Sequence, residues 1–299
     1  MQPREQLKHL RFADYTLIMG ILNVTEDSFS DGGRYITREN ARTHGRDLIN
    51  AGADILDIGA ESSRPTAQRV PQDVEKERIV RTLADLADFA HERGVAISVD
   101  TTRASVAQAA LENGADIIND VSGGCEDPDM FPLIAHNPCL YILQHWRGRM
   151  PLGSTVYPHG TTVDVISELK ERVKQARAAG VAEEQIILDP GLGFNKPCPV
   201  PNFDLLAHLD AMTQLPFPIL IGASRKRFLS MTIGPDAATS KTGGDQMQLR
   251  LDEATAVISA LSALQGVWAV RVHNVACTRD ALRVANGYIT ARNNHPGRE

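Results

Sequence analysis

The sequence has no long apolar run, and its first 15 residues are mostly polar. A helix that crosses a bilayer needs about 20 consecutive apolar residues, and no stretch of the 299 residues is of that kind. Residues 1–15 are polar and lack the apolar core and small-residue cleavage site of a secretory signal. The sequence therefore gives no reason to expect secretion or a membrane partner.

Cysteines are few and widely separated. They are Cys125, Cys139, Cys198 and Cys277. Without short paired spacing, they do not form the sequence pattern of a zinc site or a redox motif. We expect reduced thiols, which is the state of cysteines in the cytosol, and therefore predict a cytoplasmic protein.

Concentrated charge is also lacking. The formal net charge is −6, and the 31 Lys and Arg residues are scattered along the chain. This distribution lacks the basic patch that binds nucleic acid or an anionic membrane. With 42% hydrophobic residues the chain can bury a full core, so we expect a soluble globular protein that acts on small molecules.

The sequence does contain a repeated alternation of short apolar runs, polar loops and amphipathic stretches. The eight runs cover residues 16–24, 53–59, 95–100, 116–121, 139–145, 185–190, 218–224 and 268–274. Nearly continuous apolar runs suit parallel strands buried on both faces. Eight such units without a linker predict a single-domain α/β fold, the (β/α)8 TIM barrel, whereas a doubly wound open sheet usually has fewer strands or a second domain.

The boundaries of this barrel follow from the first and last units. We assign residues 16–292 to the barrel, residues 1–15 to an N-terminal extension and residues 293–299 to a polar C-terminal tail. Helices are predicted over 73–93, 103–113 and 163–179, each followed by a glycine. The polar segment 234–250 is rich in turn formers, and we interpret it as a mobile surface insertion.

Polar residues gather at the ends of the predicted strands, where such barrels form their active sites. They are Asn23, Asp57, Asp100, Asn119, Asp120, Asp189, Ser224, Arg271 and His273. Asp100, Asn119 and Asp189 offer two carboxylates and an amide that can read the donor and acceptor edge of a nitrogen heterocycle. For each residue alone, helix capping or solvation of a strand end is the alternative.

Cationic residues follow the last two strands. Arg271 and His273 share one face of a strand just before a helix, an arrangement suited to a phosphate group. The alternative is that Arg271 pairs with a buried carboxylate. Arg225 and Lys226 follow the seventh strand, where Lys226 would lie near an electron-rich ring or an oxygen that gains charge; a solvated basic turn is the alternative.

Three loops at the same end of the barrel are rich in Gly, Ser or Pro. Segments 23–33 and 60–68 are long for this fold, which suggests lids, and Phe29 in the first either covers a ligand or anchors the loop. In segment 188–196, Gly191 and Gly193 allow the backbone to approach a flat ligand or to form a tight turn. Phe194 and Lys196 follow them.

Seven motifs resemble those of dihydropteroate synthases, in the same order, across about residues 16–290. They are IMGILNVTEDSFSDGG, AESSRP, SVDTTR, IINDVSGG, LDPGLGF, GASRKRFL and RVHNV. The resemblance implies a pterin-binding TIM barrel. It also implies a transferase that condenses 6-hydroxymethyl-7,8-dihydropterin diphosphate with 4-aminobenzoate to give 7,8-dihydropteroate and diphosphate in folate biosynthesis.

The resemblance also assigns roles to individual residues. It places Asp100, Asn119, Asp189, Gly222, Phe194 and Lys226 at the pterin, and Asn23, Arg271 and His273 at the diphosphate, with Asp57 beside the loop that completes the site. Phe29, Ser62, Ser63, Arg64, Pro65 and Arg227 would bind 4-aminobenzoate. Asp100, Asp189, Lys226 and Arg271 would be catalytic.

Further expectations follow from the same resemblance. Asn23 would hold Mg²⁺ on the diphosphate, since amide and phosphate oxygens are hard ligands. Sulfonamides would compete with 4-aminobenzoate, and the chain would form a homodimer through helices near its carboxyl end.

The sequence departs from the family pattern at five positions. Glu26 stands where Pro is frequent, Ala60 where Gly is, Ser63 where Thr is, Gln144 where Met is and Asn274 where Asp is. The departures at Gln144, Ala60 and Glu26 keep open a noncatalytic pterin-binding paralogue. A methyltetrahydrofolate-dependent methyltransferase is a further alternative, disfavoured by the intact SRK and RVH segments.

Overall fold

Eight parallel strands form one sheet in the computed structural model, which describes residues 5–24, 38–61, 69–149, 153–234 and 243–294. They are β1 (Leu17–Asn23), β2 (Ile55–Gly59), β3 (Ala96–Asp100), β4 (Ile117–Asp120), β5 (Leu140–Gln144), β6 (Ile186–Asp189), β7 (Leu220–Ile221) and β8 (Ala269–Val272). Their order is β6-β5-β4-β3-β2-β1-β8-β7. A parallel bridge between Leu188 of β6 and Ile219, just before β7, joins the two outer strands. The sheet thereby closes into the predicted barrel.

Every apolar run contains a strand, so the pattern of eight is confirmed, although the strands are shorter than the runs. The largest difference is β7, which has two residues where seven were predicted. Pro218 lies just before it and has no N–H to donate to a neighbouring strand. Its carbonyl still accepts a hydrogen bond from Leu188 N at 2.9 Å, which preserves the contact with β6.

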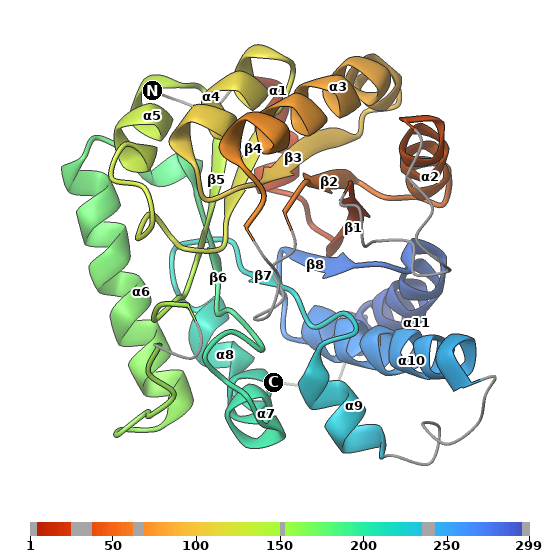
Figure 1. Ribbon diagram of the computed structural model, residues 1–299. Helices are drawn as coiled ribbons and strands as arrows, with labels where there is room; N and C mark the ends of the chain where they lie inside the picture. Colours follow the sequence, from red (N-terminus) through yellow and green to blue (C-terminus); the bar gives the residue numbers. More distant parts are fainter. Residues whose placement is uncertain (1–4, 25–37, 62–68, 150–152, 235–242, 295–299) are drawn as a thin grey trace.

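Helices enclose the strands, and most of them form a ring around the barrel (Figure 1). They are α1 (Glu5–Arg11), α2 (Arg38–Asn50), α3 (Gln72–His91), α4 (Ala104–Glu112), α5 (Met130–His136), α6 (Thr161–Ala178), α7 (Pro199–Ala207), α8 (Leu209–Thr213), α9 (Arg227–Ile233), α10 (Gly243–Leu264) and α11 (Val275–Asn293). The predicted helices are confirmed as α3, α4 and α6. The interpretation of 234–250 as an insertion is wrong for its second part, because residues 243–250 are helical and begin α10.

Two apolar clusters divide the core. The inner cluster fills the barrel with residues such as Met19, Ile142 and Leu220, and the outer cluster packs the strands against the helices. Helix α1 belongs to the inner cluster through Leu7 and Leu10. The backbone of Leu10 also accepts a hydrogen bond from the indole of Trp268 at 2.7 Å. Helix α1 therefore covers the end of the barrel where the strands begin, and the domain boundary at residue 16 stays a prediction.

None of the helices in the described ranges has the length and apolar character that a membrane span requires.

Candidate active site

The barrel interior becomes polar at the carboxyl ends of the strands. Side chains along a strand alternate between its two faces, and the deeper inward positions, such as Met19 and Ile187, are apolar. The inward positions nearest the carboxyl ends are Asn23, Asp57, Asp100, Asn119, Gln144, Asp189, Gly222 and Arg271. Strand geometry therefore brings residues that are distant in sequence to one mouth of the barrel.

Arg271 connects two carboxylates at this mouth. Its Nε donates to Asp57 Oδ2 at 2.6 Å, and its Nη2 donates to Asp100 Oδ2 at 2.7 Å. The hydroxyl of Ser98 donates to Asp57 Oδ1 at 2.7 Å, and the amide nitrogen of Asn119 lies 3.4 Å from Asp57 Oδ2. Arg271 thus pairs with two carboxylates inside the barrel, and its predicted role at a phosphate group stays a prediction.

The carboxyl group of Asp100 has a pKa near neutral pH. Burial, partly opposed by Arg271 and reinforced by Asp57, raises the pKa of Asp100 to about 7. Although burial would lower the pKa of Arg271, the two carboxylates raise it above its ordinary value. Arg271 therefore stays charged, while Asp100 changes its charge near neutral pH.

Asp189 and Lys226 form a second polar group. A Cβ atom built on Gly222 would lie 3.8 Å from Asp189 Oδ2, 3.8 Å from Lys226 Nζ and 3.9 Å from Arg271 Cβ. A carboxylate, an ammonium group and the Arg271 side chain therefore converge beside Gly222. These polar groups make this the part of the mouth best suited to a polar heterocycle.

The pKa values of this pair move toward each other. Burial raises the pKa of Asp189, and Lys226 acts against the shift. Burial also lowers the pKa of Lys226 to about 8, again partly opposed by Asp189. Such perturbed groups at the mouth of a barrel are typical of a functional site.

The loop after β6 surrounds Lys226. Gly191 and Gly193 have φ angles of 67° and 77°, which L side chains rarely adopt, so the glycines are required by the backbone. Lys226 Nζ donates to the carbonyl of Leu192. It also lies 4.8 Å from the centroid of the Phe194 ring, within reach of a cation–π contact.

Sequence reasoning assigned no role to Lys196, which ends the same loop. Its side chain is 1% exposed, and its ammonium contacts two backbone carbonyls and His145. A lysine is almost never fully buried unless it is paired. Its place in a turn-rich segment, directly after Gly, Phe and Asn, was the available signal, but spacing does not reveal which side chain of a loop turns inward.

His273 lies at the start of α11. Its backbone N donates to Ser224 Oγ at 3.1 Å, and its Nδ1 lies 2.9 Å from the same oxygen. If the Ser224 hydroxyl donates to Nδ1, the imidazole carries its proton on Nε2. Asn274 caps α11 by accepting from Cys277 N at 3.0 Å.

The structure explains why Asn suits position 274. Its side-chain nitrogen donates to Asp252 Oδ2 at 3.1 Å, and Asp252 also binds Arg225 through both carboxylate oxygens. An aspartate at this position would put a second carboxylate beside Asp252, whereas asparagine supplies a donor. The side chain of Arg225 is held by α10 in this way, while Lys226 turns toward the barrel.

Two strand-end residues serve the framework. Asp120 is on the outward face of β4, where its carboxylate accepts from Tyr141 and from the backbone of Ser122 and Gly124. Gln144 is 4% exposed, and its side chain donates to Val121 O at 3.1 Å. For Asp120, the alternative of a capping role is the one that the contacts support.

The remaining predicted contacts lie at the rim or outside the described residues. Arg227 is exposed at the first position of α9. Phe29, Ser62, Ser63, Arg64, Pro65 and Glu26, together with most of the two predicted lids, are outside the described residues.

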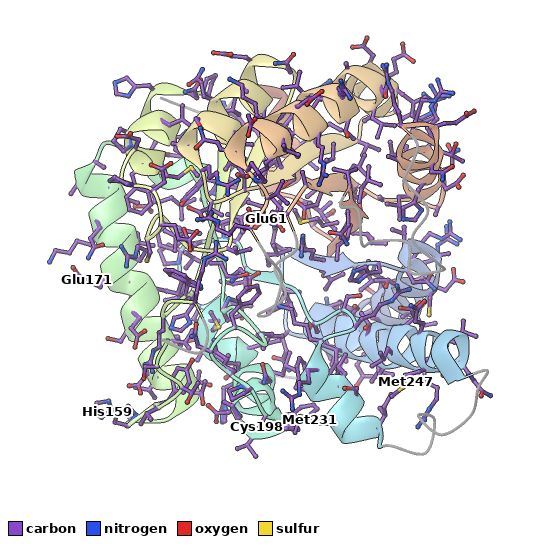
Figure 2. The ribbon with its side chains drawn as sticks, in the orientation of Figure 1. Glu61, His159, Glu171, Cys198, Met231 and Met247 are labelled. Atoms are coloured by element: carbon purple, nitrogen blue, oxygen red, sulfur yellow. The ribbon has the colours of Figure 1, made fainter. Side chains whose placement is uncertain are left out.

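An ion network joins the two described ends of the second loop. Figure 2 shows Glu61 near the centre of the view, where β2 ends. Glu61 Oε1 lies 3.3 Å from Arg69 Nε, and Glu61 Oε2 lies 3.1 Å from Arg103 Nη2. Arg69 Nη2 also lies 3.2 Å from Glu126 Oε2. These charged residues were not predicted, because their pairing depends on tertiary contacts between loops.

Comparisons with known proteins identify the family of this chain. The family model of pterin binding enzymes matches residues 19–273. The dihydropteroate synthase of Mycobacterium leprae (strain TN) is 45% identical over 278 residues, covering 92% of this chain and 94% of that protein.

Solved structures give the same answer. The Xanthomonas albilineans dihydropteroate synthase with 4-aminobenzoic acid has a TM-score of 0.79 and 34% identity, covering 92% of this chain and 94% of that one. The Yersinia pestis dihydropteroate synthase in a sulfonamide drug complex has a TM-score of 0.80 and 31% identity, covering 92% and 95%. The chain therefore belongs to the pterin-binding enzymes and, within them, to the dihydropteroate synthases.

Proposed function

We propose that the polar mouth of the barrel binds 6-hydroxymethyl-7,8-dihydropterin diphosphate and transfers its pterinylmethyl group to 4-aminobenzoate. The observation that carries this proposal is the convergence of Asp189, Lys226 and Arg271 beside Gly222 at the mouth of the barrel. The C–O bond to diphosphate breaks, and the arylamine nitrogen attacks the methylene carbon and loses a proton. No covalent enzyme intermediate is needed.

The pterin occupies the inner part of this site. We assign the acceptors for its N–H groups to Asp100 and Asp189, and further polar contacts to Asn119 and Lys226. Gly222 provides the space for the ring, and Phe194 covers it. As diphosphate leaves, the carboxylates stabilise the positive charge that develops at the methylene carbon.

The diphosphate lies toward β8 and α11. Two nitrogens of Arg271 bind carboxylates inside the barrel, so we assign its Nη1 to the diphosphate. His273 donates through Nε2, and the backbone N–H groups at the start of α11 favour an anion. Together these groups stabilise the leaving diphosphate.

Asn23 is the residue suited to Mg²⁺ on the diphosphate. The described residues contain no group of three His, Cys, Asp or Glu side chains that would form a metal site by themselves. The Asn23 amide oxygen lies 3.7 Å from a Cβ built on Gly59, at the open end of β1. One amide oxygen completed by diphosphate oxygens fits Mg²⁺, which neutralises phosphate charge when bound.

The 4-aminobenzoate site is proposed at the rim. Arg227 supplies a cation for the carboxylate, and Phe29, Ser63, Arg64 and Pro65 complete the site. The solved relatives with 4-aminobenzoic acid and with a sulfonamide drug support this assignment for the ligand class. We therefore expect sulfonamides to compete with 4-aminobenzoate in this cytosolic enzyme.

Diphosphate release tests the function directly. We expect the purified protein with the pterin diphosphate and Mg²⁺ to release diphosphate only when 4-aminobenzoate is present, with an equal amount of dihydropteroate. Pterin binding without turnover would contradict the synthase and favour the noncatalytic paralogue. Methyl transfer from methyltetrahydrofolate would instead indicate the methyltransferase.

We also propose that the chain forms a homodimer through α10 and α11, which pack against each other. Both helices expose large apolar side chains at helical spacing. They are Leu249, Val257 and Leu261 on α10 and Val284 and Tyr288 on α11. An exposed apolar surface of this kind is typical of an interface.

A charge on this surface should separate the subunits. Val284 is 76% exposed, so Val284→Glu should leave the fold intact but place a carboxylate at the interface, which is unfavourable without a partner. We expect a monomer mass in light scattering where the wild type has a dimer mass. Val163→Glu is the matched control, since Val163 is 59% exposed on α6. A dimer of the Val284→Glu variant, or a monomeric wild type, would rule out this interface.

A further inference from the structure

Lys196 is a buried cation that the proposed reaction does not use. It lies at the end of the loop between β6 and α7, and its side chain is 1% exposed. The ammonium donates to Gly191 O at 3.0 Å and to Phe194 O at 3.1 Å, and it lies 3.2 Å from His145 Nδ1. These three acceptors match the three N–H donors of a charged lysine. Burial nevertheless lowers the pKa of Lys196 to about 7, so the group is held at a cost to stability.

The carbonyls that Lys196 binds belong to the loop that forms one wall of the pterin site. Between them, the carbonyl of Leu192 accepts a hydrogen bond from Lys226. Phe194 supplies both one of the bound carbonyls and the ring that lies 4.8 Å from Lys226 Nζ. The loop shape that Lys196 fixes is therefore the shape that positions Lys226 and Phe194.

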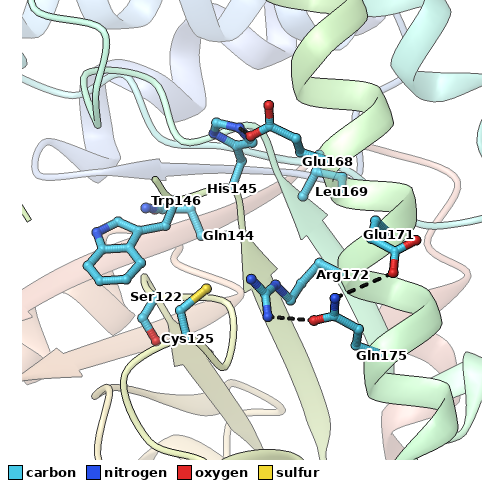
Figure 3. A pocket seen from close by; sticks show the side chains of 10 residues that line it. All are labelled: Ser122, Cys125, Gln144, His145, Trp146, Glu168, Leu169, Glu171, Arg172 and Gln175. Atoms are coloured by element: carbon cyan, nitrogen blue, oxygen red, sulfur yellow. Dashed lines mark hydrogen bonds and ion pairs between the residues drawn. The ribbon is translucent and has the colours of Figure 1, made fainter. Parts of the chain in front are cut away.

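His145 supports Lys196 from β5 and α6. Burial lowers the pKa of His145 to about 4, so its ring is neutral. With Nδ1 accepting from Lys196, Nε2 carries the proton and donates to Glu168 Oε2 at 3.0 Å. His145 and Glu168 line a cavity of about 160 Å³ between β5 and α6. Both side chains are labelled in Figure 3. This network thus connects the outer helix to the pterin-site loop.

Asn202 reinforces the same loop from α7. Its side-chain oxygen accepts from Gly193 N at 2.7 Å, and its nitrogen donates to the carbonyls of Lys196 at 2.9 Å and Cys198 at 2.6 Å. Buried side chains thus bind backbone groups along the loop. A loop that already has its binding conformation loses less conformational entropy when the ligand binds.

We propose that Lys196 is a positioning residue for pterin binding, which it achieves by holding the carbonyls of Gly191 and Phe194 so that Lys226 and Phe194 face the heterocycle. This inference rests on the proposed assignment of Lys226 and Phe194 to the pterin. Lys196 itself does not contact the substrate. A purely structural lysine would change folding stability without changing the affinity of folded molecules for pterin.

The test is Lys196→Met, which keeps an unbranched side chain shorter by one atom and removes its charge and donors. We expect the Kd for 6-hydroxymethylpterin monophosphate, measured by calorimetry, to rise about 10- to 100-fold, because small misplacements of binding groups have effects of this size. The KM for 4-aminobenzoate at saturating pterin diphosphate should not change. Lys174→Met is the control, since Lys174 is exposed on α6.

A second variant keeps the test decisive if Lys196→Met does not fold. His145→Leu removes one of the three acceptors of Lys196 and leaves the two carbonyls, so the pterin Kd should rise less, by about fivefold, which corresponds to one hydrogen bond. An unchanged pterin Kd in whichever of these variants folds would overturn the positioning role. Failure of the wild type to release diphosphate would instead overturn the proposed function.

Discussion

Arg271→Met is expected to lose activity and stability together. Loss of one preorganised cationic donor at a leaving group costs about 10²- to 10³-fold in kcat. The variant also leaves Asp57 and Asp100, both bonded to Arg271 in the wild type, without a counter-charge. Removing one partner of a buried ion pair costs about 3–5 kcal/mol of unfolding free energy. Steady-state kinetics and thermal unfolding measure the two losses.

The stability loss should depend on pH. Without Arg271, the charged forms of the carboxylates are disfavoured, and the pKa of Asp100, already about 7 in the wild type, rises further. The part of the loss due to Asp100 is therefore full above the raised pKa of the variant and shrinks as pH falls to about 7, because below that pH Asp100 is neutral in both folded proteins. Arg38→Met is the control, because Arg38 is 69% exposed in its pair with Asp85 and such pairs contribute about 0–1 kcal/mol. A gap in melting temperature that does not vary with pH would contradict this account.

The barrel was predictable from sequence because its signal is periodic. Each strand is buried on both faces and appears as an apolar run, and the polar residue at its end marks the mouth. The prediction was poorest near β7, where Pro218 limits strand pairing, and at 243–250, where a polar helix start resembles a loop. The first turns of α10 are polar, and only its later turns carry the apolar periodicity by which a helix is recognised in sequence.

The inward residues of the mouth were predictable for the same reason. Asp100, Asp189 and Arg271 are inward by strand alternation, and the structure brings them to one space. Asp120 shows the limit of the rule, because it ends a strand but lies one position out of phase and faces the helices. Because successive side chains of a strand face opposite sides, Asn119 and Asp120 of β4 could have been assigned to different faces from the sequence.

Contacts between loops were not predictable. Lys196 and His145 are 51 residues apart, and the Glu61 and Arg103 pair depends on the packing of two loops. No periodicity specifies such pairs, since a loop side chain turns inward or outward according to tertiary contacts. Residues that shape the site from a distance are therefore found only in the structure.

Asp189→Asn should remove activity without reducing stability. Gly191 N donates to Asp189 Oδ1 at 2.7 Å, so the amide oxygen of the introduced side chain takes that place and its NH2 group faces the pocket. There it meets Lys226 and the N–H groups of the pterin, which are also donors. Buried polar groups that face each other without a matching donor and acceptor strongly reduce transition-state binding. We therefore predict that kcat/KM for the pterin diphosphate falls about 10²- to 10³-fold, the size of effect that hydrogen bonds to charged groups have.

The stability of this variant follows from the sign of the pKa shift. Burial raises the pKa of Asp189 above its ordinary value of 3.8, so the charged carboxylate costs stability as pH rises above that value, and the neutral amide avoids the cost. Asp120→Asn is the matched control, since Asp120 is also a buried strand-end carboxylate with a raised pKa but faces outward. It should keep kcat/KM and lose about 1–3 kcal/mol of unfolding free energy through its lost hydrogen bonds. If Asp189→Asn instead lowered the melting temperature and kept kcat/KM, Asp189 would belong to the framework and the pterin would have to bind elsewhere.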